Sequence, residues 1–413
     1  MCGNRAAPMS RNCVRCISGR SPSGHSCADQ YPSLDLADPV DVFTETKRKL
    51  EGQTHEVVAR TLAPAALVAV GLMNAASVHA DDNGFFGQRN AYVVTPLVSD
   101  LSGKANVTDP NLKNSWGVAF TPSAGAFWIS DNATGLSTLY DGAGTIVNLP
   151  NNATPVVIPC PPKAGQGSSC PNTASPSGMV WNPSSAFLVP GTTSPAIFLL
   201  VSEDGTISAW TTGPNPANQA VLAVDNSVNL NPTLGAVYKG AVFGVNVNSV
   251  FLFATNLRAG TIDVFDHNYK LVTTGGGFSD PGIPPGFAPL GIENINGDLF
   301  VTYAKQNAAK NADVAGPGNG FLDVFDTDGH LKRRFASRGP LNSPWGVAHA
   351  SFAFGRFSGL ILVGNFGNGR VNVFDSRGDF IDELDTAGGQ RLVVDGLWKL
   401  TLGGGTNSST DTL

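Results

Sequence analysis

The chain is poor in charged side chains. Asp, Glu, Lys and Arg together make up only 14% of its 413 residues, and the formal net charge is −6. Such a balance gives no broad attraction to nucleic acid or to anionic lipid, so we exclude a nucleic-acid-binding protein. Forty-eight glycines and 28 prolines favour a turn-rich, all-β chain over a helical one.

Long apolar runs are also missing. The longest, Thr61–Met73, is too short to cross a bilayer comfortably, so we expect no stable membrane span in the mature chain. This run follows Arg60 and precedes Val78-His79-Ala80, which together are typical of a secretory signal peptide. The sequence therefore predicts a disordered or spuriously translated leader over 1–59, a signal peptide over 60–80 and a mature domain over 81–413. The predicted location is periplasmic or extracellular.

Histidine and cysteine are scarce after residue 80. His267, His330 and His349 occupy inequivalent places, which argues against a zinc site that needs three protein ligands. Cys160 and Cys170 bracket a short loop rich in Pro, Gly and Ser. In an oxidising compartment we expect them to form a structural disulfide.

What the sequence does have is a repeat. The stretch Leu341–Gly378 contains three short runs rich in β-branched or aromatic residues, separated by Gly, Asn and Asp turns, so it predicts strands. Related stretches recur about every 50 to 62 residues. Each has a glycine at one place: Gly117, Gly178, Gly240, Gly291, Gly346 and Gly396. Aromatic residues recur in the third strand, where we expect inter-blade core: Tyr140, Trp210, Phe265, Phe325 and Phe374. Six repeat units, each beginning near one of these glycines, predict a six-bladed β-propeller.

The fifth copy resembles an NHL repeat. It reads Pro-Trp-Gly-Val-Ala from Pro344, and then Gly-Asn-Gly-Arg-Val-Asn-Val-Phe-Asp through Asp375. With Tyr303–Asn307, Asp313–Asp326 and Asp395–Trp398, the chain is similar to an uncharacterised family of exported bacterial propeller proteins. The resemblance implies the fold and export over Asn90 to Leu402, and no reaction. It also implies further strands after the last copy, so we expect the last blade to be incomplete at the C-terminus.

Two sets of loops should surround one mouth of the propeller channel. Polar residues close the second strand in several copies, including Asp131, Asn256 and Asn365, and Glu293 lies on an inner strand. Such oxygens suit a hard cation such as Ca²⁺. Six-bladed lactonases hold a metal in this way and use it as a Lewis acid. The alternative is that Asn and Asp stand there because turns favour them.

Further candidate residues lie at the same mouth. Trp116 and Trp345 begin inner strands and could stack on a sugar or peptide group, or simply pack in the core. Lys305 and Lys310, in the long 304–319 loop, are candidate partners for an anionic ligand, unless the loop is only solvated.

Two hypotheses on function follow. The first is an exported binding or interaction module for a protein, glycan or small ligand, with no known activity. The second is a Ca²⁺-dependent hydrolase of the lactonase type, acting at the channel mouth. We favour the first because no repeat places an unmistakable general base beside a ligand set.

Overall fold

A computed structural model describes the backbone of residues 13–18 and residues 90–122, 124–150, 154–162, 174–212, 218–228, 234–246, 249–404 and 408–413. Among these residues, no helix has the length and apolar character that a membrane span requires. The predicted signal peptide and most of the predicted leader lie outside the described residues.

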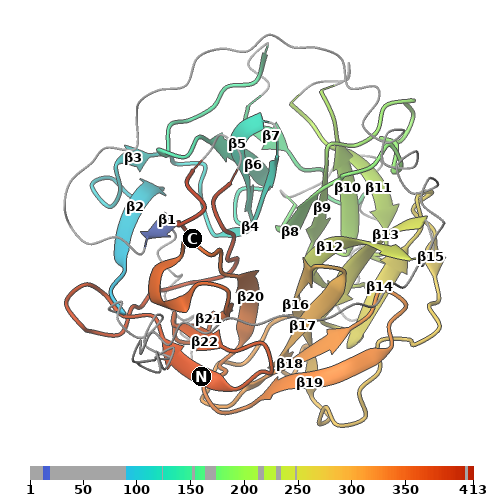
Figure 1. Cartoon of the computed structure of the whole chain (residues 1–413). Helices are drawn as coiled ribbons and strands as arrows, with labels where there is room; N and C mark the ends of the chain where they lie inside the picture. The colour runs from blue at the N-terminus through green and yellow to red at the C-terminus, as the bar shows by residue number, and fades with distance from the viewer. Residues whose placement is uncertain are drawn as a thin grey trace, which may run out of the picture. The chain divides into compact units, whose positions relative to one another are not determined.

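Five antiparallel sheets of four consecutive strands make up most of this part of the chain (Figure 1). The first blade contains β4 (Ser115–Thr121), β5 (Ala124–Asp131), β6 (Leu136–Tyr140) and β7 (Val156–Val157). The second contains β8 (Pro176–Trp181), β9 (Phe198–Ser202), β10 (Thr206–Trp210) and β11 (Val221–Asp225). The third contains β12 (Tyr238–Asn246), β13 (Ser249–Asn256), β14 (Thr261–Phe265) and β15 (Leu271–Val272). The fourth contains β16 (Phe287–Ile295), β17 (Asp298–Lys305), β18 (Gly320–Phe325) and β19 (Leu331–Ser337). The fifth contains β20 (Pro344–His349), β21 (Ile361–Asn365), β22 (Val371–Phe374) and β23 (Phe380–Glu383), with the short 3₁₀ helix η2 (Gly355–Phe357) between β20 and β21.

The all-β propeller is confirmed, but the predicted number of blades is wrong. Five four-stranded blades are present in the described residues, not six. Residues 395–401, predicted to begin a sixth blade, form no strand and run beside β20 as an irregular segment. The NHL-like subtype remains a prediction.

The repeated glycines mark close contacts between neighbouring inner strands. A Cβ on Gly117 would lie 2.5 Å from Ser177 O, and one on Gly178 would lie 2.8 Å from Lys239 O. Gly240 and Gly291 approach the next inner strand in the same way. Inner-strand backbones therefore touch, and any side chain at these positions would force them apart.

The same pattern of backbone contacts shows which residue occupies the sixth repeat position, and it is not the one that the sequence predicted. A Cβ on Gly346 would meet Trp398 O at 2.8 Å and Leu400 N at 2.5 Å, which flank Lys399. By this register Lys399, and not Gly396, is the sixth equivalent of the repeated glycines. Trp398 then corresponds to Trp116 and Trp345, each of which precedes its repeat glycine.

The core lies between adjacent blades. The third-strand aromatics predicted as core are confirmed, because all are at most 2% exposed: Tyr140, Trp210, Phe265, Phe325 and Phe374. Trp210, Phe265, Phe325 and Phe374 lie in the clusters between successive blades, whereas Tyr140 packs with Val98 of the strand that precedes the first blade.

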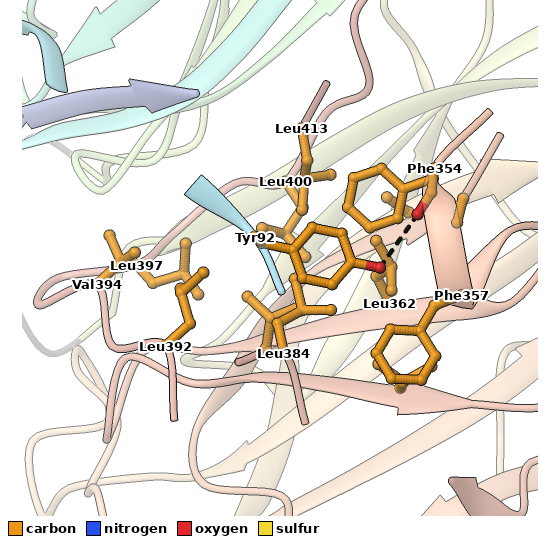
Figure 2. Close-up of a cluster of buried hydrophobic side chains, with 14 residues drawn as sticks. Tyr92, Phe354, Phe357, Leu362, Leu384, Leu392, Val394, Leu397, Leu400 and Leu413 are labelled. Atoms are coloured by element: carbon orange, nitrogen blue, oxygen red, sulfur yellow. Dashed lines mark hydrogen bonds between the residues drawn. The ribbon is translucent and has the colours of Figure 1, made fainter. Parts of the chain in front are cut away.

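Residues that precede the first blade and residues that follow the fifth blade together cover one face of the fifth blade. Figure 2 shows Tyr92, Leu397, Leu400 and Leu413 packed together with the fifth-blade residue Phe354. The Tyr92 hydroxyl donates to the Phe354 carbonyl oxygen at 3.1 Å. This apolar cluster occupies part of the sector in which a sixth blade was expected.

A separate three-stranded sheet precedes the first blade. It consists of β1 (Cys13–Ser18), β2 (Val93–Ser99) and β3 (Val107–Thr108). β1 pairs antiparallel with β2, and β3 pairs parallel with it. Residues 13–18 therefore form a strand, although they fall in the leader that the sequence predicts to be disordered.

Candidate functional site

The four candidate Ca²⁺ ligands are not brought together. Asp131, Asn256 and Asn365 each end a second strand, opposite the first residue of an inner strand. Glu293 lies near the other end of its inner strand, β16, where it is opposite Phe300 and forms an ion pair with Lys399.

Hydrogen bonds within the protein occupy the side chains of two of these residues, Asn256 and Asn365. The side-chain oxygen of Asn256 accepts from Val237 N at 3.2 Å, and its amide donates to Asp263 at 3.0 Å. Asn365 likewise accepts from Asn342 N at 3.1 Å. The side-chain oxygen of Asn256 also accepts from Ala259 N at 3.3 Å in the turn after β13, which supports the turn interpretation at that position. In the described part of the chain, no group of three or more His, Cys, Asp or Glu side chains could hold a metal ion.

Asp131 is buried within the first blade and is 0% exposed. Burial raises the pKa of its carboxyl well above the ordinary value of 3.8, although hydrogen bonding from Thr138 opposes the shift. The charge of Asp109 raises the pKa further. A raised pKa disfavours the carboxylate anion that a cation requires as its ligand.

The tryptophans predicted at an open mouth are packed at the propeller axis. Trp116 and Trp345 are 6% and 3% exposed. Trp116 stacks on Trp398 with ring centroids 3.9 Å apart, and Trp398 stacks on Phe366 at 3.8 Å. Trp345 meets Trp116 and Trp398 edge-on. Of the two interpretations of Trp116 and Trp345, the structure therefore favours core packing.

A buried lysine continues this stack. The Lys239 Nζ lies 4.7 Å from the centroid of the Trp116 ring, and Lys239 is 1% exposed. It forms an ion pair with Glu203, whose side chain is 25% exposed. The second carboxylate oxygen of Glu203 accepts from Asn132 at 3.0 Å. Residues of three blades thus meet on this end of the axis.

The long 304–319 loop adds Asp313 to the cluster. Gln306 donates to Leu257 O at 2.6 Å, and Gly316 N donates to Asn342 at 2.7 Å, so the loop is tied to the third and fifth blades. Burial raises the pKa of Asp313, Ser343 and the charge of Lys239 oppose the shift, and Glu203 adds to it. Among the described residues, Oδ2 of Asp313 and Oγ of Ser343 are both buried without a well-formed hydrogen bond, although Ser343 is near enough to lower the pKa of Asp313.

We call Asn132, Glu203, Lys239 and Asp313 the axial cluster. The sequence pattern places Asn132, Glu203 and Asp313 in polar loops but does not connect them, and Lys239 was missed. The sequence does contain a signal that distinguishes Lys239. The residues that precede the repeated positions are Trp116, Ser177, Lys239, Leu290, Trp345 and Trp398, and among them only Lys239 is charged.

The remaining candidates are not part of this cluster. Lys305 and Lys310 are exposed, and no ion pair involving either is present in the described residues. They remain candidate partners for an anion. Cys160 is disulfide-bonded. Cys170 lies outside the described residues, so its pairing with Cys160 stays a prediction.

Comparison with known proteins gives viral relatives, two of which are described here. No protein-family model matches the chain. It is 32% identical over 333 residues to uncharacterized protein R648 of Acanthamoeba polyphaga mimivirus, covering 76% of this chain and 74% of that protein. It is 30% identical over 347 residues to uncharacterized protein L690 of the same virus, covering 79% and 83%. These relatives are viral, which corrects the expectation of a bacterial family.

Solved structures with a similar fold are more distant. A gluconolactonase from Xanthomonas campestris has 14% identity and a TM-score of 0.40, covering 71% of this chain and 81% of that chain. An inactive virginiamycin B lyase from Staphylococcus aureus has 14% identity and a TM-score of 0.38, covering 71% and 77%. We transfer neither activity to this chain.

Proposed function

The chain belongs to the family of uncharacterized proteins that includes mimivirus R648 and L690, and we propose that it is an exported β-propeller binding module. Its ligand is a polyhydroxyl compound such as an oligosaccharide, held at the axial cluster. The observation that carries this proposal is Oδ2 of Asp313, a buried acceptor without a hydrogen bond among the described residues, on a side chain whose pKa responds to the charges of Lys239 and Glu203.

Buried polar atoms are normally paired, because an unsatisfied buried acceptor costs free energy. Asp313 Oδ2 therefore suits a hydrogen-bond donor supplied by a ligand. Glu203 is partly exposed and offers carboxylate oxygens, while the exposed Lys305 lies at the end of β17, next to the loop that carries Asp313. Hydroxyl groups both donate and accept, so one sugar ring can satisfy this mixture of groups.

The rigid scaffold favours binding over chemistry. The cluster is assembled from different blades and tied by hydrogen bonds, so little ordering is required when a ligand binds. The Ca²⁺-dependent alternative has no such support, because its candidate ligands are separated or occupied.

The test is calorimetric titration of the full chain with soluble cello-, chito- and malto-oligosaccharides. We expect saturable binding by at least one of them, weakened about tenfold or more by Asp313→Asn, which corresponds to the loss of about one charged hydrogen bond. Asp379→Asn is the matched control, because the Asp379 side chain is 69% exposed in a turn. Absence of binding across the panel, or equal affinity in Asp313→Asn, would refute the proposal.

Export is a second part of the proposal and rests on the sequence of residues 60–80. We expect the secreted protein to begin at Asp81. N-terminal sequencing of material recovered outside the cytoplasm tests this, and a start far upstream of Asp81 would contradict it.

A further inference from the structure

A cavity lies in the sector where a sixth blade was expected. Its volume is about 130 Å³, and it is bounded by the first blade, by β2 and by the C-terminal segment that follows Leu392. We call it the closure cavity. Its walls include Leu97, Val118, Ile129, Leu397 and Leu400.

The repeat register explains why space remains there. Between the five blades, a glycine lets each inner strand touch the backbone of the next. At the sixth position the chain has Lys399, whose side chain forms an ion pair with Glu293 of β16. Without a glycine, the C-terminal segment cannot approach β4 as closely as the inner strands approach one another. We therefore attribute the gap to Lys399, which stands in place of the glycine and pairs with Glu293.

Two polar groups distinguish this cavity from an ordinary packing defect. Trp116 and Trp398 both line it, and both are 6% exposed. The indole Nε1 of each is buried and meets no hydrogen-bond acceptor among the residues that the structure describes. Buried indole N–H groups usually find an acceptor, so the mostly apolar walls include two indole rings whose donors are unused in this part of the chain.

We propose that the closure cavity binds a small uncharged molecule with a ring-sized apolar body and one hydrogen-bond acceptor, such as a cyclic ketone. The volume is close to that of the cavity of about 150 Å³ that holds benzene in an engineered protein. It is too small for a peptide strand or a helix, whose diameter with side chains is about 10 Å. The two charged residues on its walls already have partners: Lys399 pairs with Glu293, and Asp141 accepts from Ala143 N and Thr145 N. A charged ligand would therefore lose hydration without gaining an unpaired opposite charge. This site is separate from the axial cluster and does not depend on the oligosaccharide proposal.

The probes are cyclopentanone and methylenecyclopentane, which have the same shape and differ in the acceptor. They are titrated into the isotopically labelled full chain while the indole N–H resonances are followed by NMR. We expect cyclopentanone to bind saturably with a Kd on the order of 1 mM, which is within the range for six non-hydrogen atoms. It should shift the Trp116 or Trp398 N–H signal, assigned with Trp398→Phe, and methylenecyclopentane should bind about tenfold more weakly.

Two variants locate the site. Val118→Phe places extra atoms in the cavity and should abolish binding. Leu271→Phe makes a similar enlargement at a residue that is 62% exposed on β15, and should leave binding unchanged. If Val118→Phe does not fold, the indole shifts of the unmodified chain decide the question. Non-saturable shifts, equal binding of both probes, or full binding by folded Val118→Phe would overturn the proposal.

Discussion

Trp398 joins the C-terminal segment to both neighbouring blades, so Trp398→Ala should lower the free energy of unfolding substantially. The side chain is 6% exposed, and its ring lies 3.9 Å from Trp116, 3.8 Å from Phe366 and 4.7 Å from Trp345, centroid to centroid. Truncating a buried Trp to Ala costs roughly 3–5 kcal/mol. We expect the upper part of this range, because three aromatic contacts are lost together.

The assay is equilibrium unfolding of the full chain in urea, followed by far-UV circular dichroism and extrapolated linearly to water. Phe352→Ala is the control, because Phe352 is an aromatic residue that is 89% exposed. Its effect should stay within about 0.5 kcal/mol. A double-mutant cycle with Trp116→Ala should give a coupling of about 0.5–1.5 kcal/mol. A loss below about 1 kcal/mol for Trp398→Ala would show that the C-terminal segment does not hold the first and fifth blades together.

Four further predictions use the same preparation. Lys239→Met should lower the free energy of unfolding by on the order of 2–3 kcal/mol, because it leaves Glu203 without its cation. Adding Glu203→Gln should restore part of this loss in urea unfolding. Purely additive effects of the two substitutions would refute the coupling. Gly346→Ala should cost roughly 1–3 kcal/mol, because its Cβ would lie 2.5 Å from a backbone nitrogen; Gly388→Ala, which has an ordinary contact at 3.7 Å, is the control, and equal melting temperatures would contradict the register. The raised pKa of Asp131 means that the folded state binds more protons than the unfolded state once the pH exceeds the ordinary value of 3.8, so this carboxyl removes stability as pH rises. Asp131→Asn should therefore lose less stability than the native chain between pH 4 and pH 8. Parallel curves of unfolding free energy against pH for the two proteins would contradict the raised pKa. Neither a chelator nor added Ca²⁺ should change the melting temperature, and a fall with chelator that Ca²⁺ reverses would revive the metal-dependent hydrolase.

The repeat units are largely readable from the sequence. The recurrence of the glycines and of the third-strand aromatics is readable because every blade repeats the same pattern. The core role of Phe374 was predicted from that pattern, whereas the role of Gly117 as a point of backbone contact between blades emerged only from the structure. The polar ends of the second strands were also located correctly, because they follow directly from the strand pattern.

The axial cluster could not be predicted in the same way. Glu203 and Lys239 are 36 residues apart on successive blades, and Asp313 arrives from a loop of the fourth. The ion pair of Glu203 with Lys239 and the approach of Asp313 depend on how the blades are arranged around the axis, which no local pattern encodes. The same arrangement covers Trp116 and Trp345, so residues that begin inner strands became core.

The strands and turns of one blade are encoded locally, because they depend on residues that are neighbours along the chain. How the series of blades ends depends instead on contacts between residues that are far apart in the sequence. Matching glycines suggested Gly396 as the sixth equivalent, whereas contact across space assigns that place to Lys399. A lysine cannot support the backbone contact that a glycine allows, so the last inner segment stands away from the first blade and leaves a cavity beside it.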